Sequence, residues 1–183
     1  MLALFVRIFL LTQATHAPQA HVYAAIAAET PELPAELLLA QGWKESRWTT
    51  DAVSRIEIQP DGTRARRMGT WRGKFPSRFR GPYFCGASQL RRTSEKACRA
   101  IGVDLLANYQ EAREHIEEWL AFCKKTGHPG DLDCALAGYG GGVKAAKSRS
   151  KGYRAWRYGL SVQRLAKTYR RKMEKLLTNG ESS

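Results

Sequence analysis

The chain has 183 residues, 43% of them hydrophobic, and its 30 lysines and arginines against 17 acidic residues give a formal net charge of +13. This length and apolar content exclude a disordered chain and indicate one domain that buries a hydrophobic core. The positive charge favours a polyanionic partner, such as a nucleic acid, an anionic membrane surface or an acidic cell-wall polymer. Charge alone does not choose among these partners.

Residues 1–20 begin with the apolar run MLALFVRIFLLTQATHA, which is too short and too interrupted by Arg7 to span a bilayer. As a secretory signal it is weak, because no basic residue precedes the apolar run and Pro18 follows Ala17. Two interpretations of this segment stay open. It is either a signal or anchor, or a helix that packs on the domain.

The next segments predict two helices, over about His21 to Glu29 and about Pro34 to Arg47, where Pro34 suits the first turn of the second helix. Residues 49–84 are then punctuated by glycine and proline. The alternation from Arg55 to Gln59, followed by Pro60-Asp61-Gly62, predicts a strand that enters a turn. We therefore expect a small β-hairpin or a long loop in this region.

Helical patterns return after this insertion. Thr93 or Ser94 can cap a helix through Ile101. A long amphipathic helix follows, whose apolar positions recur at steps of three and four: Tyr109, Ala112, Ile116, Trp119, Leu120 and Cys123. Residues 133–139 predict a short buried helix that the following glycines end, and the last helix has one apolar and one basic face. The predicted fold class is mainly α, with a small β-hairpin or irregular insertion and a disordered tail at 179–183.

The cysteines are Cys85, Cys98, Cys123 and Cys134. Their spacings are too wide for a C-x-x-C redox or zinc motif, and His115 and His128 do not complete a ligand pattern. We therefore predict no metal site and no cofactor. One or two disulfides in an oxidising compartment and buried free thiols are both compatible with this even number.

Glu45 stands at the C-terminal end of its predicted helix, where the helix dipole opposes negative charge. Its helical face, shared with Leu38, Gln41 and Gly42, offers no lysine or arginine for an ion pair. If this carboxylate points into a cleft, desolvation raises its pKa and lets it donate a proton to a glycosidic oxygen. A solvated or capping glutamate is the alternative.

Four sequence features follow one another in order: LLLAQGWKESRW with its Glu-Ser pair, CGASQL, Asn108 at the head of the long helix, and ALAGYGGG. Together they resemble the soluble lytic transglycosylase and goose-type lysozyme family, across about residues 21–178. The resemblance implies a lysozyme-like fold. The chain departs from the family where Ala87 and Ser88 replace Leu-Met and where Gly140 stands in place of the usual asparagine.

The resemblance implies that Glu45 is the catalytic acid and base. It also implies a set of substrate-binding residues: Ser46, Gly86, Gln89, Asn108 and Tyr139. The implied reaction cuts the MurNAc-GlcNAc β-1,4 bond of peptidoglycan with a single glutamate and leaves an anhydro-muramyl end. A hydrolytic lysozyme needs a second carboxylate, for which Asp51 and Asp61 are the candidates.

Two basic clusters contain aromatic residues. One runs from Arg64 to Arg80 with Trp71, Phe75 and Phe79, and the other runs from Lys144 into the last helix with Tyr153, Trp156 and Tyr158. Such clusters are commonly solvated surface, but their aromatic rings can stack on sugars or on nucleobases. We expect the first cluster to flank a substrate groove.

The predicted partners are peptidoglycan glycan strands and anionic wall polymers, and the protein is expected to be a monomer without a membrane span. It would act in the periplasm, after secretion, or after delivery by a phage, and a bacterial or a phage origin both fit. A basic helical nucleic-acid-binding protein is the alternative of another class. A lysozyme-like module that binds glycan without cutting it is a third reading.

Overall fold

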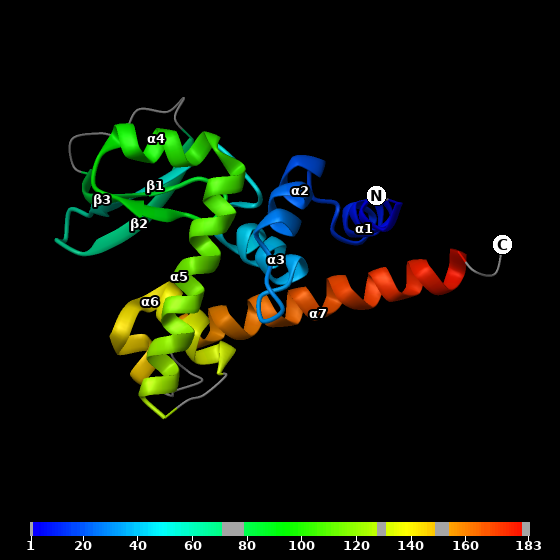
Figure 1. Cartoon of the computed structure of the whole chain (residues 1–183). Coiled ribbons are helices and arrows are strands. Elements are labelled where there is room, and N and C mark those ends of the chain that lie inside the picture. The colour runs from blue at the N-terminus through cyan, green and yellow to red at the C-terminus, as the bar shows by residue number, and fades with distance from the viewer. Residues whose placement is uncertain (1, 71–78, 128–130, 149–153, 181–183) are drawn as a thin grey trace.

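The computed structural model describes residues 2–70, 79–127, 131–148 and 154–180, and within these it contains seven helices and four strands (Figure 1). The predicted class, mainly α with a small β insertion, is confirmed. The helices are α1 (Leu2–Thr15), α2 (Gln19–Ala28), α3 (Ala35–Ser46), α4 (Glu95–Val103), α5 (Leu105–Lys125), α6 (Leu132–Lys147) and α7 (Arg154–Gly180). The strands are β1 (Ala52–Ile58), β2 (Arg64–Thr70), β3 (Phe79–Cys85) and β4 (Leu90–Arg92).

The strands form one antiparallel sheet in the order β2-β1-β3-β4. The predicted hairpin is β1–β2, and its turn is closed where the Gln59 amide donates to the Thr63 carbonyl at 2.8 Å. Helix α4 lies against the sheet (Figure 1) and begins at Ser94, whose hydroxyl accepts from the Ala97 amide. A disulfide between Cys85 and Cys98 joins β3 to α4. These elements make up one lobe of the molecule.

The centre of the molecule is α3, in which Leu37–Ala40 are all buried, as expected for a helix that is apolar on every side. Helix α5 passes along this centre and links the parts of the core (Figure 1). It contributes Ala112 to the cluster beneath the sheet, Ile116 to the central core, and Cys123 to the cluster around α6. A second disulfide, Cys123–Cys134, ties α5 to α6.

Two helix ends differ from the predictions. Helix α6 continues through Gly140 and Gly141 to Lys147 and leaves helical geometry only at Gly142, where φ is 70°. Helix α7 extends to Gly180, so residues 179 and 180, predicted to begin a disordered tail, are helical, while 181–183 lie outside the described residues. Helix α7 therefore begins before Val162, the first apolar position that the sequence pattern indicated, and ends beyond Leu176, the last.

Helix α1 packs on the domain, which is the second of the two interpretations of residues 1–20. Ile8 and Leu11 belong to the central core, and the Arg7 side chain forms an ion pair with Glu29. The helix contacts α2 and α7. Among the helices of the described residues, none combines the length and the apolar character that a bilayer crossing requires.

Candidate functional site

Glu45 lies in the last turn of α3, and its side chain is only 10% exposed. The helix ends sharply because Arg47 and Trp48 both adopt left-handed backbone conformations with φ of 58°. Such conformations are uncommon for these residue types and persist where the surroundings impose them. Here the Trp48 indole donates a hydrogen bond to the Leu39 carbonyl at 2.9 Å, which holds the turn against the helix.

Ser46 ties the end of α3 to the turn that precedes β4. Its buried hydroxyl donates to the Ala87 carbonyl at 2.9 Å and accepts from the Thr49 amide at 3.1 Å. Both hydrogen bonds are to the protein backbone. Ser46 therefore stabilises the turn after α3. A contact between Ser46 and substrate stays a prediction.

The electrostatic setting of Glu45 combines burial with one nearby cation. Burial raises the pKa of the Glu45 carboxyl above its ordinary value, while the Arg66 guanidinium and the Tyr158 hydroxyl oppose the rise. The Nη2 atom of Arg66 is 3.7 Å from Oε2 of the glutamate. A raised pKa means that the carboxyl holds its proton to a higher pH than a solvated glutamate does. It is thus suited to act as a proton donor.

Arg66 is held in place by a hydrogen-bond network on β2, β1 and the turn before β4. Its Nε donates to Ser54 Oγ at 2.7 Å, its Nη2 donates to Gln89 Oε1 at 3.1 Å, and its guanidinium lies 4.3 Å from the Phe84 ring centre. Gln89 also accepts from the Ser54 hydroxyl at 2.7 Å. Gln89 therefore belongs to the site, where it positions the cation that faces Glu45.

Two tyrosines lie beside Glu45. The Tyr139 hydroxyl donates to the Ser88 carbonyl at 2.7 Å, which places this predicted residue in the site. The Tyr158 hydroxyl is close enough to lower the pKa of Glu45, but its geometry does not meet that of a hydrogen bond. Burial, followed by the nearby Glu45 carboxylate, raises the pKa of both phenols well above the ordinary value. Both remain protonated at neutral pH and can donate hydrogen bonds.

Buried polar atoms gather around these tyrosines. Within the described residues, the Tyr158 hydroxyl, Gln41 Oε1 and Ser88 Oγ are all buried without a hydrogen-bond partner. Gln41 is fully buried on α3 and interacts with both tyrosines. Buried polar groups are normally paired, so unpaired ones beside a buried acid mark a place suited to a polar ligand.

Gly86 and Asn108 lie behind the turn that carries Gln89. The Asn108 side chain is fully buried, accepts from the Ser88 amide at 2.8 Å and donates to the Cys85 carbonyl at 3.3 Å. Gly86 has a φ of 70°, and a Cβ atom there would collide with the Asn108 amide. Both residues thus shape the turn. Their predicted contact with substrate stays a prediction.

Neither candidate for a second carboxylate is paired with Glu45 in this geometry. Asp61 is fully exposed in the β1–β2 turn, and its carboxylate accepts from the Thr63 amide at 2.9 Å. Asp51 is half-buried in the segment between α3 and β1. Among the described residues, the groups that shift the pKa of Glu45 are Arg66 and Tyr158, and neither is an acid.

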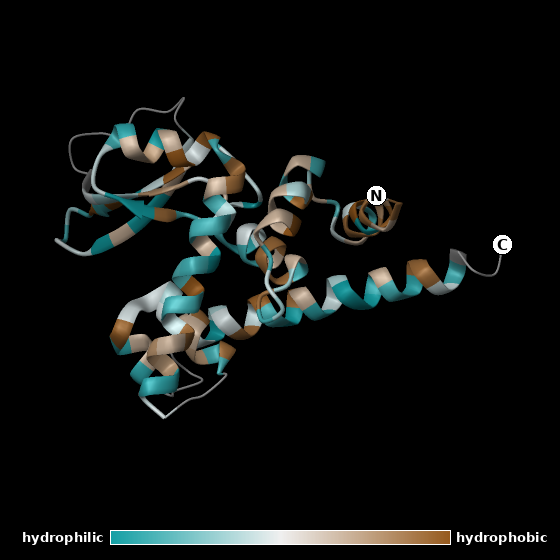
Figure 2. Cartoon of the chain, viewed as in Figure 1, coloured by the Kyte–Doolittle hydropathy of each residue, from teal (hydrophilic) through white to brown (hydrophobic). Residues whose placement is uncertain are grey.

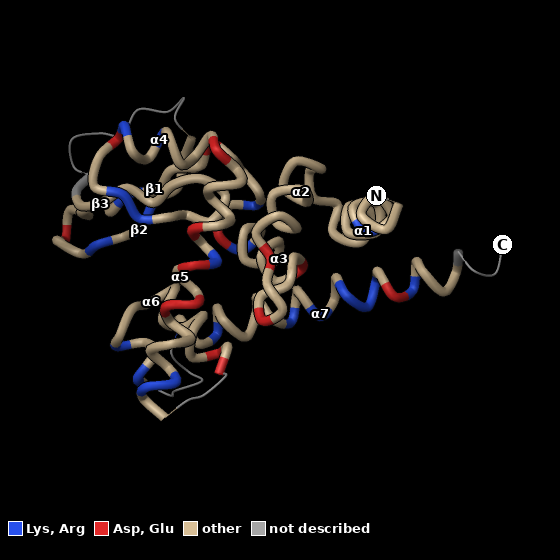
Figure 3. The backbone as a smooth tube through the Cα atoms, viewed as in Figure 1, with Lys and Arg blue, Asp and Glu red and all other residues tan. Residues whose placement is uncertain are grey.

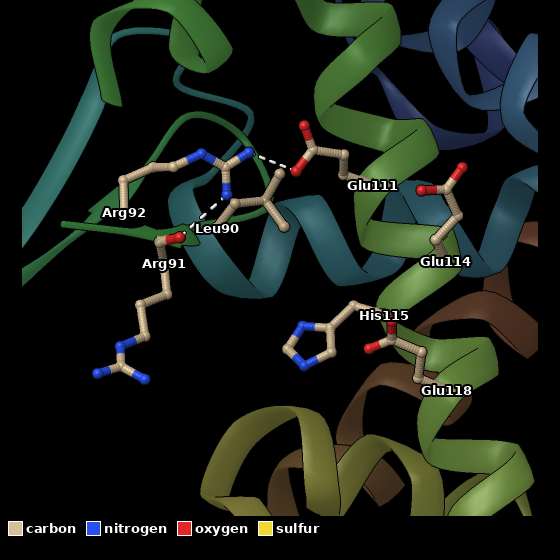
Figure 4. Close-up of a pocket in the computed structure, with 7 residues that line it drawn as sticks. All are labelled: Leu90, Arg91, Arg92, Glu111, Glu114, His115 and Glu118. Carbon is tan, nitrogen blue, oxygen red and sulfur yellow. Dashed lines mark hydrogen bonds and ion pairs between the residues drawn. The ribbon is translucent and has the colours of Figure 1, made fainter. Parts of the chain in front are cut away.

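A cavity of about 280 Å³ lies between β4 and one face of α5. Figure 4 shows the His115 ring projecting from α5 below Leu90, with Arg91 extending away from the Arg92–Glu111 ion pair. Its lining residues are Leu90, Arg91, Arg92, Glu111, Glu114, His115 and Glu118. The cavity thus carries both signs of charge.

His115 connects this cavity to the site. Its ring centre is 5.1 Å from that of Tyr139, and its Nε2 accepts a hydrogen bond from the Trp119 indole at 3.1 Å. Burial lowers the pKa of the imidazole, although nearby Glu118 opposes this. His115 therefore lines the cavity and also packs against Tyr139.

Sequence reasoning recognised Arg66 and Tyr158 only as parts of the two basic clusters, and considered His115 only as a metal ligand. Tyr158 lies four residues before Val162, so extending the apolar face of α7 by one turn would have included it. Gly140, a departure from the resembled family, leaves room for this ring, because a Cβ there would lie 3.2 Å from Tyr158 Cδ1. Trp71 and Phe75 of the first cluster, and Tyr153 of the second, lie outside the described residues.

The described residues contain no group of three or more histidine, cysteine or acidic side chains that could hold a metal ion. What the site brings together is one buried carboxyl, one arginine and two phenols, drawn from α3, β2, α6 and α7. In comparisons with known proteins, no family model matches the chain, and neither the curated proteins nor the solved structures give a match.

Proposed function

We propose that the protein is a lytic transglycosylase that cleaves the glycan strands of peptidoglycan, with Glu45 as the catalytic acid and base. The observation that carries this proposal is the burial of Glu45, 10% exposed with a raised pKa, beside Arg66 and the two tyrosines. The order of motifs that resembles the soluble lytic transglycosylases supports the same assignment. We also propose that the fold is lysozyme-like, as this resemblance implies.

In the proposed reaction, protonated Glu45 donates its proton to the oxygen of the MurNAc-GlcNAc β-1,4 bond as the bond to the anomeric carbon breaks. Positive charge develops on the sugar, and the carboxylate that has just formed lies 3.7 Å from the Arg66 guanidinium. The carboxylate then takes the proton of the muramyl C6 hydroxyl as that oxygen closes on the anomeric carbon. The product is an anhydro-muramyl end, and Glu45 regains its proton.

The proposed mechanism uses one glutamate, and the groups that lower its pKa are Arg66 and Tyr158. A hydrolytic lysozyme is the nearest alternative and would require Asp51 or Asp61 to activate water. Asp61 accepts two hydrogen bonds from Thr63 within the β1–β2 turn, which hold its carboxylate there. Asp51 is the stronger of the two candidates, because it lies only five residues after Ser46, the last residue of α3.

Several other properties follow from this proposal. The two disulfides fit a protein that works in an oxidising place, whether the periplasm, the outside of the cell or a cell wall reached by a phage. The exposed basic residues of β2 are suited to a long anionic substrate. We propose that the protein acts as a monomer on peptidoglycan and the polymers attached to it.

Nucleic-acid binding is the alternative of another class, and the basic face of α7 favours it. It assigns no role to a buried glutamate with a raised pKa. Binding to duplex DNA that is tighter than binding to purified sacculi, and equally strong in Glu45→Gln, would support this alternative.

The test of activity is clearing of purified sacculi by the wild-type protein, by Glu45→Gln and by Glu95→Gln, a matched change at an exposed glutamate on α4. The proposal predicts clearing by the wild type and by Glu95→Gln, and a loss of at least about a thousandfold in Glu45→Gln, because the amide cannot transfer a proton. Sacculi that stay intact with folded wild-type protein would reject it.

A further inference from the structure

Helix α1 has two apolar faces, and only one of them is packed. Ile8 and Leu11 belong to the central core. On the other face, Leu2, Phe5 and Phe9 follow at helical spacing and are 79%, 59% and 60% exposed. A helix at a protein surface normally presents polar residues to water, and contiguous exposed apolar side chains mark a binding surface.

The packed face and the ion pair between Arg7 and Glu29 hold α1 in a fixed orientation, so the bare face is a stable feature of the molecule. A helix of 14 residues is about 21 Å long. This is shorter than the hydrocarbon core of a bilayer, about 30 Å thick. The helix can lie in a membrane surface, but it cannot cross one.

Helix α7 lies next to α1 and supplies positive charge (Figures 1 and 3). Its C-terminal half exposes Arg171, Lys172 and Lys175, with Glu174 as the one acid in the helix. The same end exposes Leu176 and Leu177, the latter by 47%, so exposed apolar and basic side chains are neighbours there. Figure 2 shows α1 as a largely apolar helix beside this mixed one.

We propose that α1 and the C-terminal half of α7 dock the protein onto an anionic lipid bilayer. The exposed phenylalanines of α1 enter the headgroup region, while the basic residues of α7 bind lipid phosphates. A second copy of the chain is a poorer occupant, because it would bring another charge of +13 towards the same surface. The docking surface is distinct from the Glu45 site and does not depend on the function proposed for it.

The proposal is tested with the full chain by co-sedimentation with vesicles at physiological ionic strength. Vesicles that contain phosphatidylglycerol are compared with vesicles of phosphatidylcholine alone. The wild type is expected to bind the anionic vesicles at least about tenfold more tightly. Phe5→Ser/Phe9→Ser should lose at least about tenfold in affinity for these vesicles, because two exposed rings no longer leave water on binding. Tyr23→Ser, at an exposed ring on α2, is the matched control and should bind like the wild type.

The charge contribution is tested with Arg171→Glu/Lys172→Glu. This variant should lose affinity for the anionic vesicles and show a weaker dependence on salt. The same change in charge at the exposed Lys124→Glu/Lys125→Glu, at the end of α5, should have a much smaller effect. In addition, Phe9→Trp should shift its fluorescence emission to shorter wavelength when anionic vesicles are added.

Three outcomes would overturn the proposal. The wild type could remain in the supernatant with both kinds of vesicle. The matched controls could lose as much affinity as the α1 and α7 variants. Finally, sedimentation velocity could reveal a dimer that Phe5→Ser/Phe9→Ser converts to monomer, in which case a second copy covers α1. Because every substituted side chain is exposed, unfolding is not an expected cause of lost binding, and circular dichroism checks this directly.

Discussion

Glu45 and Arg66 form the pair of side chains on which the proposed chemistry depends. Burial raises the pKa of the glutamate, and the guanidinium at 3.7 Å limits that rise. The first step needs the protonated carboxyl, so activity should fall as the pH rises through the pKa of Glu45. Replacing Arg66 by methionine removes the cation and should move this alkaline limb of kcat/KM to higher pH.

The check is the pH profile of glycan cleavage for Arg66→Met, with Arg66→Lys to restore charge and Arg64→Met as a matched change on the same strand. Arg66→Lys should return the limb towards its wild-type position, and Arg64→Met should leave it in place. The position of the limb is the informative quantity, since loss of the contacts to Gln89 and Ser54 will lower the rate as well. A limb that does not move in Arg66→Met would contradict this role.

Tyr158 is expected to matter for activity and much less for stability. Its hydroxyl is buried near Glu45 without a hydrogen bond in normal geometry, so removing it leaves no partner unsatisfied. Tyr158→Phe should therefore unfold at nearly the same urea concentration as the wild type while its kcat falls about tenfold. Tyr169→Phe, on the same helix and also buried, is the control and should keep full kcat. Equal losses in the two variants would count against a role in the site.

His21 predicts an acid sensitivity of the fold that is separate from the site. It is 2% exposed, lies 3.1 Å from the Tyr109 hydroxyl, and has a pKa lowered by burial to about 4. The neutral ring is the form that the fold accommodates. Above the pKa of the unfolded chain, near 6.5, His21 is neutral in both states and does not oppose folding. As the pH falls from 6.5 towards 4, the unfolded chain binds a proton that the folded protein does not, so the free energy of unfolding decreases.

The loss amounts to at most about 3.5 kcal/mol, from about 1.4 kcal/mol for each pKa unit. Urea unfolding of His21→Gln between pH 7 and pH 4 should show a shallower decline in the free energy of unfolding than the wild type does. His16→Gln, at an exposed histidine beside α1, serves as control and should follow the wild type. If the two variants show the same slope, burial of His21 is not the cause.

At the scale of secondary-structure elements, we expect both disulfides to stabilise the fold, but only one of them to affect activity. Cys123–Cys134 joins α5 to α6 in the lobe away from the sheet, and Cys85–Cys98 joins α4 to the strand that leads into Gly86. Each closes a loop of similar length, with separations of 11 and 13 residues, worth about 3 kcal/mol of unfolding free energy.

Urea unfolding of the double-alanine variants should show a similar loss for each pair. Cleavage measured well below the unfolding midpoint should fall only in Cys85→Ala/Cys98→Ala, because that pair borders the turn that carries Gln89. Loss of activity in Cys123→Ala/Cys134→Ala under conditions where it stays folded would contradict this division.

Elements with strong local signals could be predicted from the sequence. Pro34 is the N-cap of α3, Ser94 caps α4, and the Pro60-Asp61-Gly62 turn closes the β1–β2 hairpin. The path of α6 could not be predicted, because its glycines serve packing instead of ending the helix. A Cβ at Gly138 would collide with the Trp119 ring, and one at Gly140 would press on Tyr158. Tertiary contacts thus override the low helix propensity of glycine.

The site itself could be predicted only in part. Glu45, Gln89 and Tyr139 are each part of a short motif, so their order along the chain indicated them. Arg66 faces Glu45 only through the antiparallel pairing of β1 with β2, and Tyr158 only through the packing of α7 on α6. The sequence alone does not give the register of two paired strands or the packing of two helices, so contacts between such distant residues could not be predicted.

At the scale of the whole molecule, the site and the proposed membrane surface share one helix, α7, and use opposite ends of it. Helix α7 places Tyr158 beside Glu45 near its start and exposes Lys175 near its end. At 27 residues the helix is about 40 Å long, so the two surfaces are well separated. A molecule docked on a bilayer through α1 would keep its site free for a glycan.

The central claim is that Glu45 alone supplies both the acid and the base for cleavage of a glycan strand. Mass analysis of the fragments released from purified sacculi tests it most directly, because an anhydro end and a reducing end differ by one water. The account predicts anhydro-muramyl ends from the wild-type protein and from Asp51→Asn and Asp61→Asn, and no fragments from Glu45→Gln. Reducing ends that disappear in Asp51→Asn or Asp61→Asn would contradict it and identify a hydrolase with two carboxylates.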